Sequence, residues 1–190
     1  MQDMTERFIE KTITSEEVYK GKLLHAFSDR IELPNGHEAV REYLRHPGAV
    51  CLVPLTEENE VIMVWQYRYP FHRMMLEIPA GKLDAGEAPE AAARRELSEE
   101  TGADAEELID LGTFYPSVAY TDEVIHTYLA RGLTFRKQHP DDDEFLAVER
   151  IPLDRLVEQV LDGTISDGKT QSAILKAAAW LKKEHAEKGV

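Results

Sequence analysis

Cysteine is almost absent from the chain, since Cys51 is the single thiol among 190 residues. One cysteine excludes an internal disulfide, so the fold depends on a packed core. The apolar content of 43% is sufficient for such a core. Because Cys51 lies in the apolar run 49–53, we expect a buried structural thiol and not a nucleophile.

Long hydrophobic runs are also missing. No stretch approaches the roughly 20 apolar residues that a membrane-spanning helix needs. The first residues, MQDMTERFIEK, are charged and lack the hydrophobic region of a signal peptide. We therefore expect a cytoplasmic protein that does not bind membranes.

Basic residues are outnumbered by acidic ones, 22 against 36, which gives a net charge of −14. General nucleic-acid binding depends on phosphate neutralisation by lysine and arginine, so we expect no nucleic-acid partner. The length predicts one domain with a small appendage.

The most informative segment is 81–103, where a helix is predicted. Pro89 suits its first turn and Gly102 the position just past its end. Ala93 and Leu97 form an apolar stripe that can pack against a sheet. Beside it, glutamates three and four positions apart share one helical face: Glu96, Glu99 and Glu100. Their mutual repulsion would be removed by a divalent cation, and carboxylate oxygens favour Mg²⁺ or Mn²⁺.

The order G-x5-E-x7-R-E-L-x-E-E-x-G-A in 81–103 resembles the Nudix box at every fixed position. The resemblance implies a Nudix hydrolase, an α/β protein with an α/β/α sandwich and a mixed sheet. It further implies that a metal-activated water attacks a phosphorus of a pyrophosphate. The implied ligands of Mg²⁺ (or Mn²⁺) are Glu96, Glu100, Glu99 and the carbonyl of Ala80. Glu99 could instead orient the attacking water. Glu87 and Arg95 are expected to buttress the loop.

Segments 41–50, 67–70, 76–82 and 117–123 resemble the ADP-ribose pyrophosphatase branch of this family. That branch hydrolyses ADP-ribose to AMP and ribose 5-phosphate. The resemblance implies that Arg68 grips phosphate and that Glu77 and Gly81 belong to the substrate site. It also implies a base or water-orienting glutamate on a late loop, which Glu144 matches best, with Asp143 as the alternative.

One position departs from the branch pattern. Ser117-Val118-Ala119 stands where Ser-Pro-Gly is usual, so Val118 replaces the loop proline. The preferred sugar is therefore open, and hydrolysis of other nucleoside diphosphate sugars, such as GDP-mannose or ADP-glucose, is an alternative. A regulator that senses ADP-ribose derivatives without hydrolysis is disfavoured by the intact glutamates.

Residues 7–45 alternate apolar and polar side chains around a hairpin turn at 34–36. They predict antiparallel strands that could not bury a core alone. We therefore divide the chain into an N-terminal β segment, 1–46, and a catalytic domain, 47–190. The resemblance implies a homodimer that exchanges these strands, which help bind the adenine, with His37 and Arg41 as base and phosphate contacts.

The catalytic part is predicted to mix strands and helices. Strands are expected at 49–55, 61–67, 108–114, 123–130 and 145–151. Helices are expected at about 154–161 and after 166–168, the latter with an apolar side of Ile174, Leu175, Ala178 and Leu181.

Overall fold

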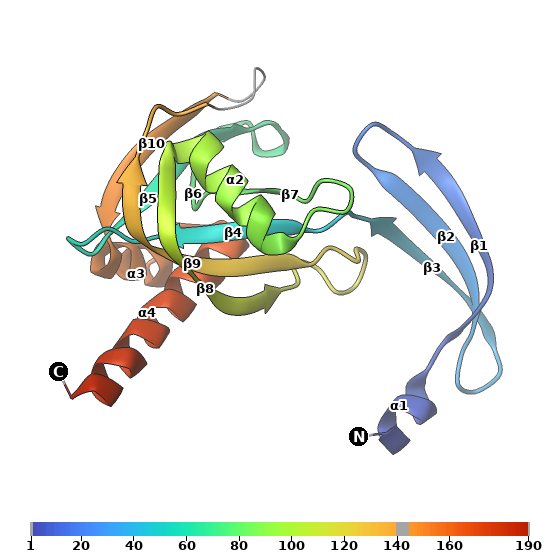
Figure 1. The fold of residues 1–190 in the computed structure, drawn as a ribbon. Helices are drawn as coiled ribbons and strands as arrows, with labels where there is room; N and C mark the ends of the chain where they lie inside the picture. Colours follow the sequence, from blue (N-terminus) through green and yellow to red (C-terminus); the bar gives the residue numbers. More distant parts are fainter. Residues whose placement is uncertain (1, 140–144, 190) are drawn as a thin grey trace. The chain divides into compact units, whose positions relative to one another are not determined.

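The structure, a computed structural model, describes residues 2–139 and 145–189 (Figure 1). The chain forms two compact units. The first contains the chain up to His46 together with Tyr115–Glu123, and the second contains Pro47–Phe114 and the chain from Val124 onward. Each unit is described by itself below.

The first unit is a three-stranded antiparallel sheet with strand order β1-β2-β3. Its elements are the helix α1 (Gln2–Phe8) and the strands β1 (Lys11–Lys20), β2 (His25–Glu32) and β3 (Glu38–Arg45). The predicted turn joins β2 to β3, where Gly36 has a φ of +81° and donates its N–H to the carbonyl of Leu33. The expectation of antiparallel strands is therefore confirmed, whereas α1 was not predicted.

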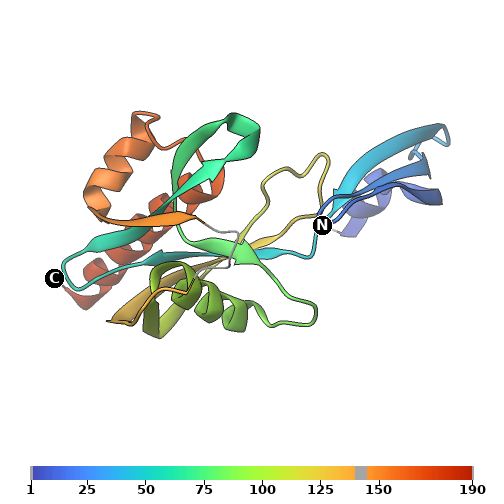
Figure 2. The ribbon, with the colours of Figure 1, turned by 90° about the horizontal axis from the view of Figure 1, so that it is seen from above.

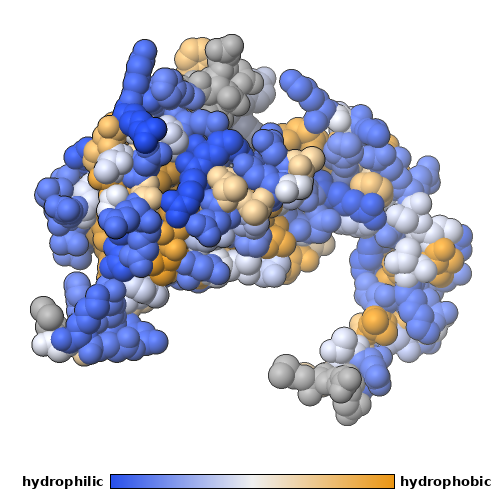
Figure 3. All heavy atoms as spheres, viewed as in Figure 1, coloured by the Kyte–Doolittle hydropathy of each residue, from blue (hydrophilic) through white to orange (hydrophobic). Residues whose placement is uncertain are grey.

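This sheet leaves much apolar surface in contact with solvent. Every residue of β1 is exposed, so the strand is open on both faces. Figure 3 shows hydrophobic side chains among hydrophilic ones on the surface of this unit. The large exposed apolar residues on or next to its strands are Ile13, Val18, Tyr19, Leu23, Leu24 and Val40. A sheet of this kind buries too little to be stable without further packing.

The second unit contains two sheets (Figure 2). The four-stranded sheet has the order β7-β4-β9-β8 and consists of β4 (Ala49–Pro54), β7 (Ala80–Lys82), β8 (Ala103–Phe114) and β9 (Ile125–Phe135). It is mixed, because β4 runs parallel to β9 and antiparallel to β7. The antiparallel three-stranded sheet has the order β10-β5-β6, formed by β5 (Glu60–Arg68), β6 (Arg73–Glu77) and β10 (Leu146–Pro152). A 3₁₀ turn, η1 (Tyr69–Phe71), links β5 to β6.

Helices cover both faces of the mixed sheet (Figure 1). Strand β4 alternates between two cores, since Val50 and Leu52 pack with α2 (Pro89–Thr101). Cys51 and Val53 pack with α3 (Leu153–Leu161) and α4 (Gly168–Lys188). A strand buried on both faces reads as a continuous apolar run for this reason. The Cys51 thiol is fully buried, and burial raises its pKa to about 11, which confirms a structural thiol.

Most predicted elements are present, with some differences. The strand predicted at 108–114 lies within the longer β8, and the one predicted at 123–130 overlaps β9, which begins two residues later and extends further. The short strands β6 and β7 were not distinguished. Leu175 was wrongly placed on the apolar side of α4, since it is 39% exposed. Ile174 and Leu181 are buried as predicted, and the helix also buries Thr170, Ala173 and Ala177. In the described part of the chain, every helix is too short or too polar to span a bilayer.

Candidate active site

Helix α2 carries the three glutamates and is fixed at both ends. Pro89 occupies its first turn, and Gly102 ends it with a φ of +68° and an N–H that donates to the carbonyl of Ser98 at 2.9 Å. Ala92, Ala93 and Leu97 are fully buried against the sheet. The apolar stripe thus packs as predicted, and it places the glutamate stripe beside the loop that follows β6.

Two of the glutamates are buried against strand β7. Glu100 is 3% exposed, and its Oε2 accepts a hydrogen bond from the backbone N–H of Ala80 at 3.0 Å. Glu96 is 8% exposed, and its carboxylate lies where a side chain at Gly81 would stand: a Cβ there would be 1.9 Å from Oε1. Only glycine at position 81 therefore permits this arrangement. Glu99 is more accessible, with 35% of its side chain exposed.

Arg95 connects the helix to the loop. Its Nη1 donates to Glu96 at 2.7 Å and to Glu99 at 3.0 Å. Its Nε and Nη2 donate to the two carboxylate oxygens of Glu87 at 2.9 and 2.8 Å, and Nη2 also reaches the carbonyl of Lys82. The expectation that Glu87 and Arg95 buttress the loop is therefore confirmed.

The hydrogen-bonded pair of Glu87 and Arg95 predicts that the stability of the fold depends on pH. Hydrogen bonds from Arg95, and then from the N–H of Asp84, lower the pKa of Glu87 from 4.5 to about 2. A lowered folded-state pKa stabilises the fold above pH 4.5, and this contribution is lost as the pH falls toward 2. We expect Glu87→Gln to lower the melting temperature at pH 7 and to make little difference near pH 2. Thermal unfolding of both proteins between pH 7 and 2 measures this, and a difference independent of pH would contradict it.

The carboxylates suit a hard divalent cation. All their donor atoms are oxygens, which hard divalent cations prefer. Two of the carboxylates, Glu96 and Glu99, already bind a cationic group, because both accept hydrogen bonds from Nη1 of Arg95. Within residues 2–139 and 145–189, no three carboxylate, imidazole or thiol side chains converge closely enough to hold a metal in this conformation. Glu96, Glu99 and Glu100 nevertheless fit such an ion in donor type and share one helix, and the guanidinium Nη1 of Arg95 supplies positive charge to Glu96 and Glu99.

A second charged cluster lies at the ends of β5 and β6. Arg68 donates side-on to Glu77 through Nε and Nη2, both at 2.6 Å. Glu77 also accepts a hydrogen bond from Lys169 at the start of α4. Although burial alone would raise the pKa of Glu77, the hydrogen bonds from Arg68 and the charge of Lys169 hold it below its ordinary value. The structure thus brings together Arg68 and Glu77, both predicted to lie in the substrate site.

The other predicted site residues are distributed differently. His37 and Arg41 belong to the first unit, where Arg41 pairs with Glu10 at 2.5 and 2.9 Å and the His37 N–H donates to Asn35. Val118 also belongs to that unit and is 83% exposed. Glu144 and Asp143 lie outside the described residues.

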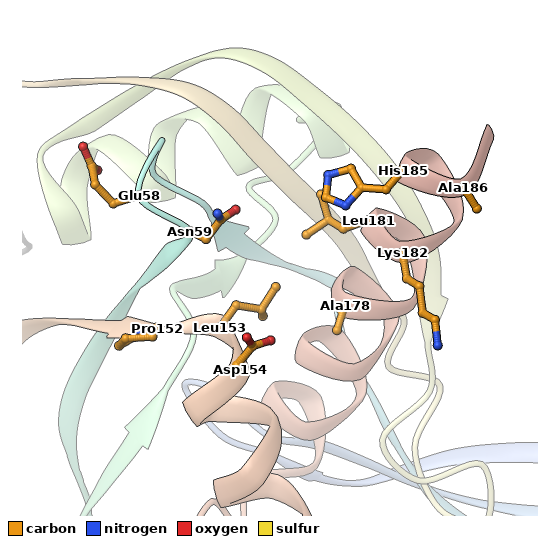
Figure 4. Close-up of a pocket in the computed structure, with 10 residues that line it drawn as sticks. All are labelled: Glu58, Asn59, Pro152, Leu153, Asp154, Ala178, Leu181, Lys182, His185 and Ala186. Carbon is orange, nitrogen blue, oxygen red and sulfur yellow. The ribbon is translucent and has the colours of Figure 1, made fainter. Parts of the chain in front are cut away.

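A sizeable cavity lies away from these residues. A hollow of about 730 Å³ lies beside the turn between β4 and β5, the start of α3 and the C-terminal half of α4 (Figure 4). Its charged lining includes Glu58, Asp154 and Lys182, so carboxylates and an ammonium group both face the cavity. No glutamate of α2 lines it. The candidate site is therefore identified by its chemistry and not by cavity size.

The chain matches two known domain families. The NUDIX domain matches residues 44–171, which include all of α2 and Lys169. The chain belongs to the Nudix family. The nucleoside diphosphate sugar hydrolase N-terminal domain matches residues 10–44, which cover most of the three-stranded sheet.

Several named proteins resemble this Nudix protein over most of its length. ADP-ribose pyrophosphatase of Bacillus subtilis (strain 168) is 42% identical over 167 residues, covering 87% of this chain and 90% of that protein. Methanol dehydrogenase activator of Bacillus methanolicus is 42% identical over 173 residues, covering 90% and 94%. GDP-mannose pyrophosphatase of Yersinia pestis (strain Pestoides F) is 31% identical over 165 residues, covering 77% and 80%.

A solved structure shares the fold. The crystal structure of ADP compounds hydrolase has a TM-score of 0.84 and 26% sequence identity, and it covers 92% of this chain and 95% of that one. The predicted Nudix-type α/β fold with a mixed sheet is therefore confirmed.

Sequence analysis did not identify three residues at the start of α4 that belong to or adjoin this charged cluster: Asp167, Lys169 and Thr170. Asp167 caps α4 and was recognised only as part of a helix start, whereas Lys169 and Thr170 were not singled out. The Asp-x-x-Thr spacing signals an N-cap. It does not signal Glu77 as the partner of Lys169, because 92 residues separate the two in the sequence.

Proposed function

We propose that this Nudix protein hydrolyses the pyrophosphate of ADP-ribose to AMP and ribose 5-phosphate with Mg²⁺. The observation that carries the proposal is the pair of buried carboxylates, Glu96 and Glu100, held against Ala80 and Gly81. Buried like charges on one helix face are costly unless a cation compensates them. The 42% identity to an ADP-ribose pyrophosphatase supports the substrate.

The glutamates of α2 take the metal-binding roles in this proposal. Glu96 and Glu100 are the main ligands of Mg²⁺ or Mn²⁺, with Glu99 and the Ala80 carbonyl as further ones. With an ion bound, Arg95 would keep its hydrogen bonds to Glu87, because these use Nε and Nη2. It would lose those to Glu96 and Glu99, which both use Nη1. A bound ion lowers the pKa of a water and neutralises charge on the phosphoryl oxygens.

The substrate-facing roles fall to residues around the β5 and β6 ends. Arg68 offers its guanidinium to the phosphates, because side-on pairing with Glu77 occupies Nε and Nη2 and leaves Nη1 out of the pair. Gly81 allows close approach of the substrate to the backbone. Glu144, which lies outside the described residues, is proposed as the base or water-orienting group.

A second candidate substrate follows from the loop that contains Val118. That residue stands where the branch usually has a proline, and its side chain is 83% exposed. The similarity to a GDP-mannose pyrophosphatase favours the same alternative. Hydrolysis of another nucleoside diphosphate sugar would use the same carboxylates and differ only in the sugar.

The proposal predicts a ranking of substrates. Purified protein is incubated with Mg²⁺ and ADP-ribose, ADP-glucose, GDP-mannose, UDP-glucose or NADH, and the products are separated by anion-exchange chromatography. We expect ADP-ribose to have the highest kcat/KM and to yield AMP. Preference for GDP-mannose would replace the substrate and retain the chemistry. Absence of hydrolysis with every compound, with either Mg²⁺ or Mn²⁺, would refute the proposal.

The proposed assembly is a homodimer in the cytoplasm, without nucleic-acid or membrane partners. The fully exposed strand β1 and the apolar side chains of the three-stranded sheet support pairing with a second copy. His37 and Arg41 would then contact the base and a phosphate of a substrate bound with the partner. Light scattering measures the mass in solution, and a monomer at micromolar concentration would contradict this assembly.

A further inference from the structure

The start of α4 is tied to the Arg68–Glu77 pair by a chain of short polar contacts. The Glu77 side chain is only 3% exposed and receives three donors, two from Arg68 and one from Lys169. The Lys169 side chain is 13% exposed and also contacts Asp167 at 3.0 Å. A lysine buried to this degree is costly unless its charge is compensated, and two carboxylates compensate it here.

The same series of contacts reaches the backbone between β6 and β7, next to Ala80, whose N–H binds Glu100. Asp167 Oδ2 caps α4 by accepting from the Thr170 N–H at 3.0 Å and from the Thr170 hydroxyl at 2.5 Å. The Thr170 oxygen in turn accepts from the N–H of Ile78 at 3.1 Å. Ile78 lies between Glu77 and the segment that contains Ala80. The helix start therefore holds both the side chain of Glu77 and the backbone next to it.

The charges of this cluster balance only when Lys169 is present. Arg68 and Lys169 contribute two positive charges, and Glu77 and Asp167 contribute two negative ones. Without Lys169 the cluster would carry a net negative charge in a protein that is already at −14. Such a cluster would repel an anionic substrate, and Arg68 alone would have to neutralise Glu77.

We propose that Lys169 is a positioning residue for the phosphate contact of Arg68. It neutralises and orients Glu77, so that the guanidinium of Arg68 is held side-on and presents its remaining edge to the pyrophosphate. This inference rests on the proposed function, because it assigns Lys169 to the same substrate site. Lys169 does not touch the substrate, and it acts through Glu77.

The test compares three lysine variants. Lys169→Met removes the charge and retains the length of the side chain, and Lys169→Arg retains the charge. Lys176→Met is the matched control, since Lys176 also joins α4 to the sheet but contacts the carbonyl of Leu111. For each, kcat and KM are measured with ADP-ribose and Mg²⁺, and the melting temperature is recorded. The affinity for ADP-ribose in EDTA is measured by calorimetry.

We expect Lys169→Met to raise KM about 10- to 100-fold, by analogy with the cost of losing a residue that orients a metal ligand. The affinity in EDTA should fall in parallel, and kcat should change less. Lys169→Arg should recover most of the loss, and Lys176→Met should leave KM unchanged. A lower melting temperature with unchanged KM and affinity would reduce Lys169 to a structural role and overturn the proposal.

A double mutant tests the path through Arg68. If Lys169 acts through the pair, Lys169→Met should have little further effect on KM in an Arg68→Ala background. Full additivity of the two effects would overturn the proposal. A wild-type protein that hydrolyses no sugar nucleotide refutes the proposed function, while the affinity in EDTA still tests Lys169. An active wild type with an unaffected Lys169→Met variant refutes only the present inference.

Discussion

Glu100→Gln is expected to reduce the rate of ADP-ribose hydrolysis by more than about a hundredfold while the fold is retained. Changes that only disturb the orientation of a metal ligand already cost about 10- to 100-fold, and loss of a ligand should cost more. The fold should survive because the glutamine oxygen can still accept the hydrogen bond from the Ala80 N–H. Initial rates at saturating Mg²⁺, together with circular dichroism, measure both parts of the expectation.

The matched control for this variant is Glu90→Gln. Glu90 lies on the same helix, its side chain is 61% exposed, and it pairs with Arg94. The Glu90→Gln variant loses the same charge as Glu100→Gln, but the change lies outside the site. Its hydrolysis rate should therefore stay close to that of the wild type. Near wild-type turnover of Glu100→Gln would remove Glu100 from the metal site.

Gly81→Ala is expected to cause a comparable loss of activity with almost no loss of stability. The new Cβ would stand 1.9 Å from Oε1 of Glu96, so the carboxylate would have to move. That carboxylate is the far end of a flexible side chain, and its displacement costs the fold little. The same displacement takes Glu96 away from the ion, because a metal ligand must be held within a few tenths of an ångström.

The measurement is the dependence of the rate on Mg²⁺ concentration, together with the melting temperature. We expect the Mg²⁺ concentration for half-maximal rate to rise strongly in Gly81→Ala. Gly168→Ala is the control, since a Cβ there would meet only Phe114 at an ordinary 3.7 Å. Unchanged Mg²⁺ dependence in Gly81→Ala would show that the ion does not require Glu96 in the position observed here.

Local sequence was sufficient for the features that depend on neighbouring residues. The bounds of α2 follow from Pro89 and Gly102, and the shared face of the glutamates follows from helical periodicity. The buried run at β4 was recognisable because a strand covered on both faces is apolar throughout. The exposed position of Leu175 was not predictable, because the side of α4 that faces the sheet depends on how the helix is docked.

The sequence by itself determined the family, the shared helical face of the glutamates and most of the strands and helices. Only the tertiary structure decided which distant residues meet. It seats Glu96 against Gly81, closes Arg95 onto Glu87, and inserts Lys169 beside Glu77 and Arg68. The physical reason is that periodicity and capping act over a few residues, whereas these contacts depend on the packing of α2 and α4 on opposite faces of one sheet.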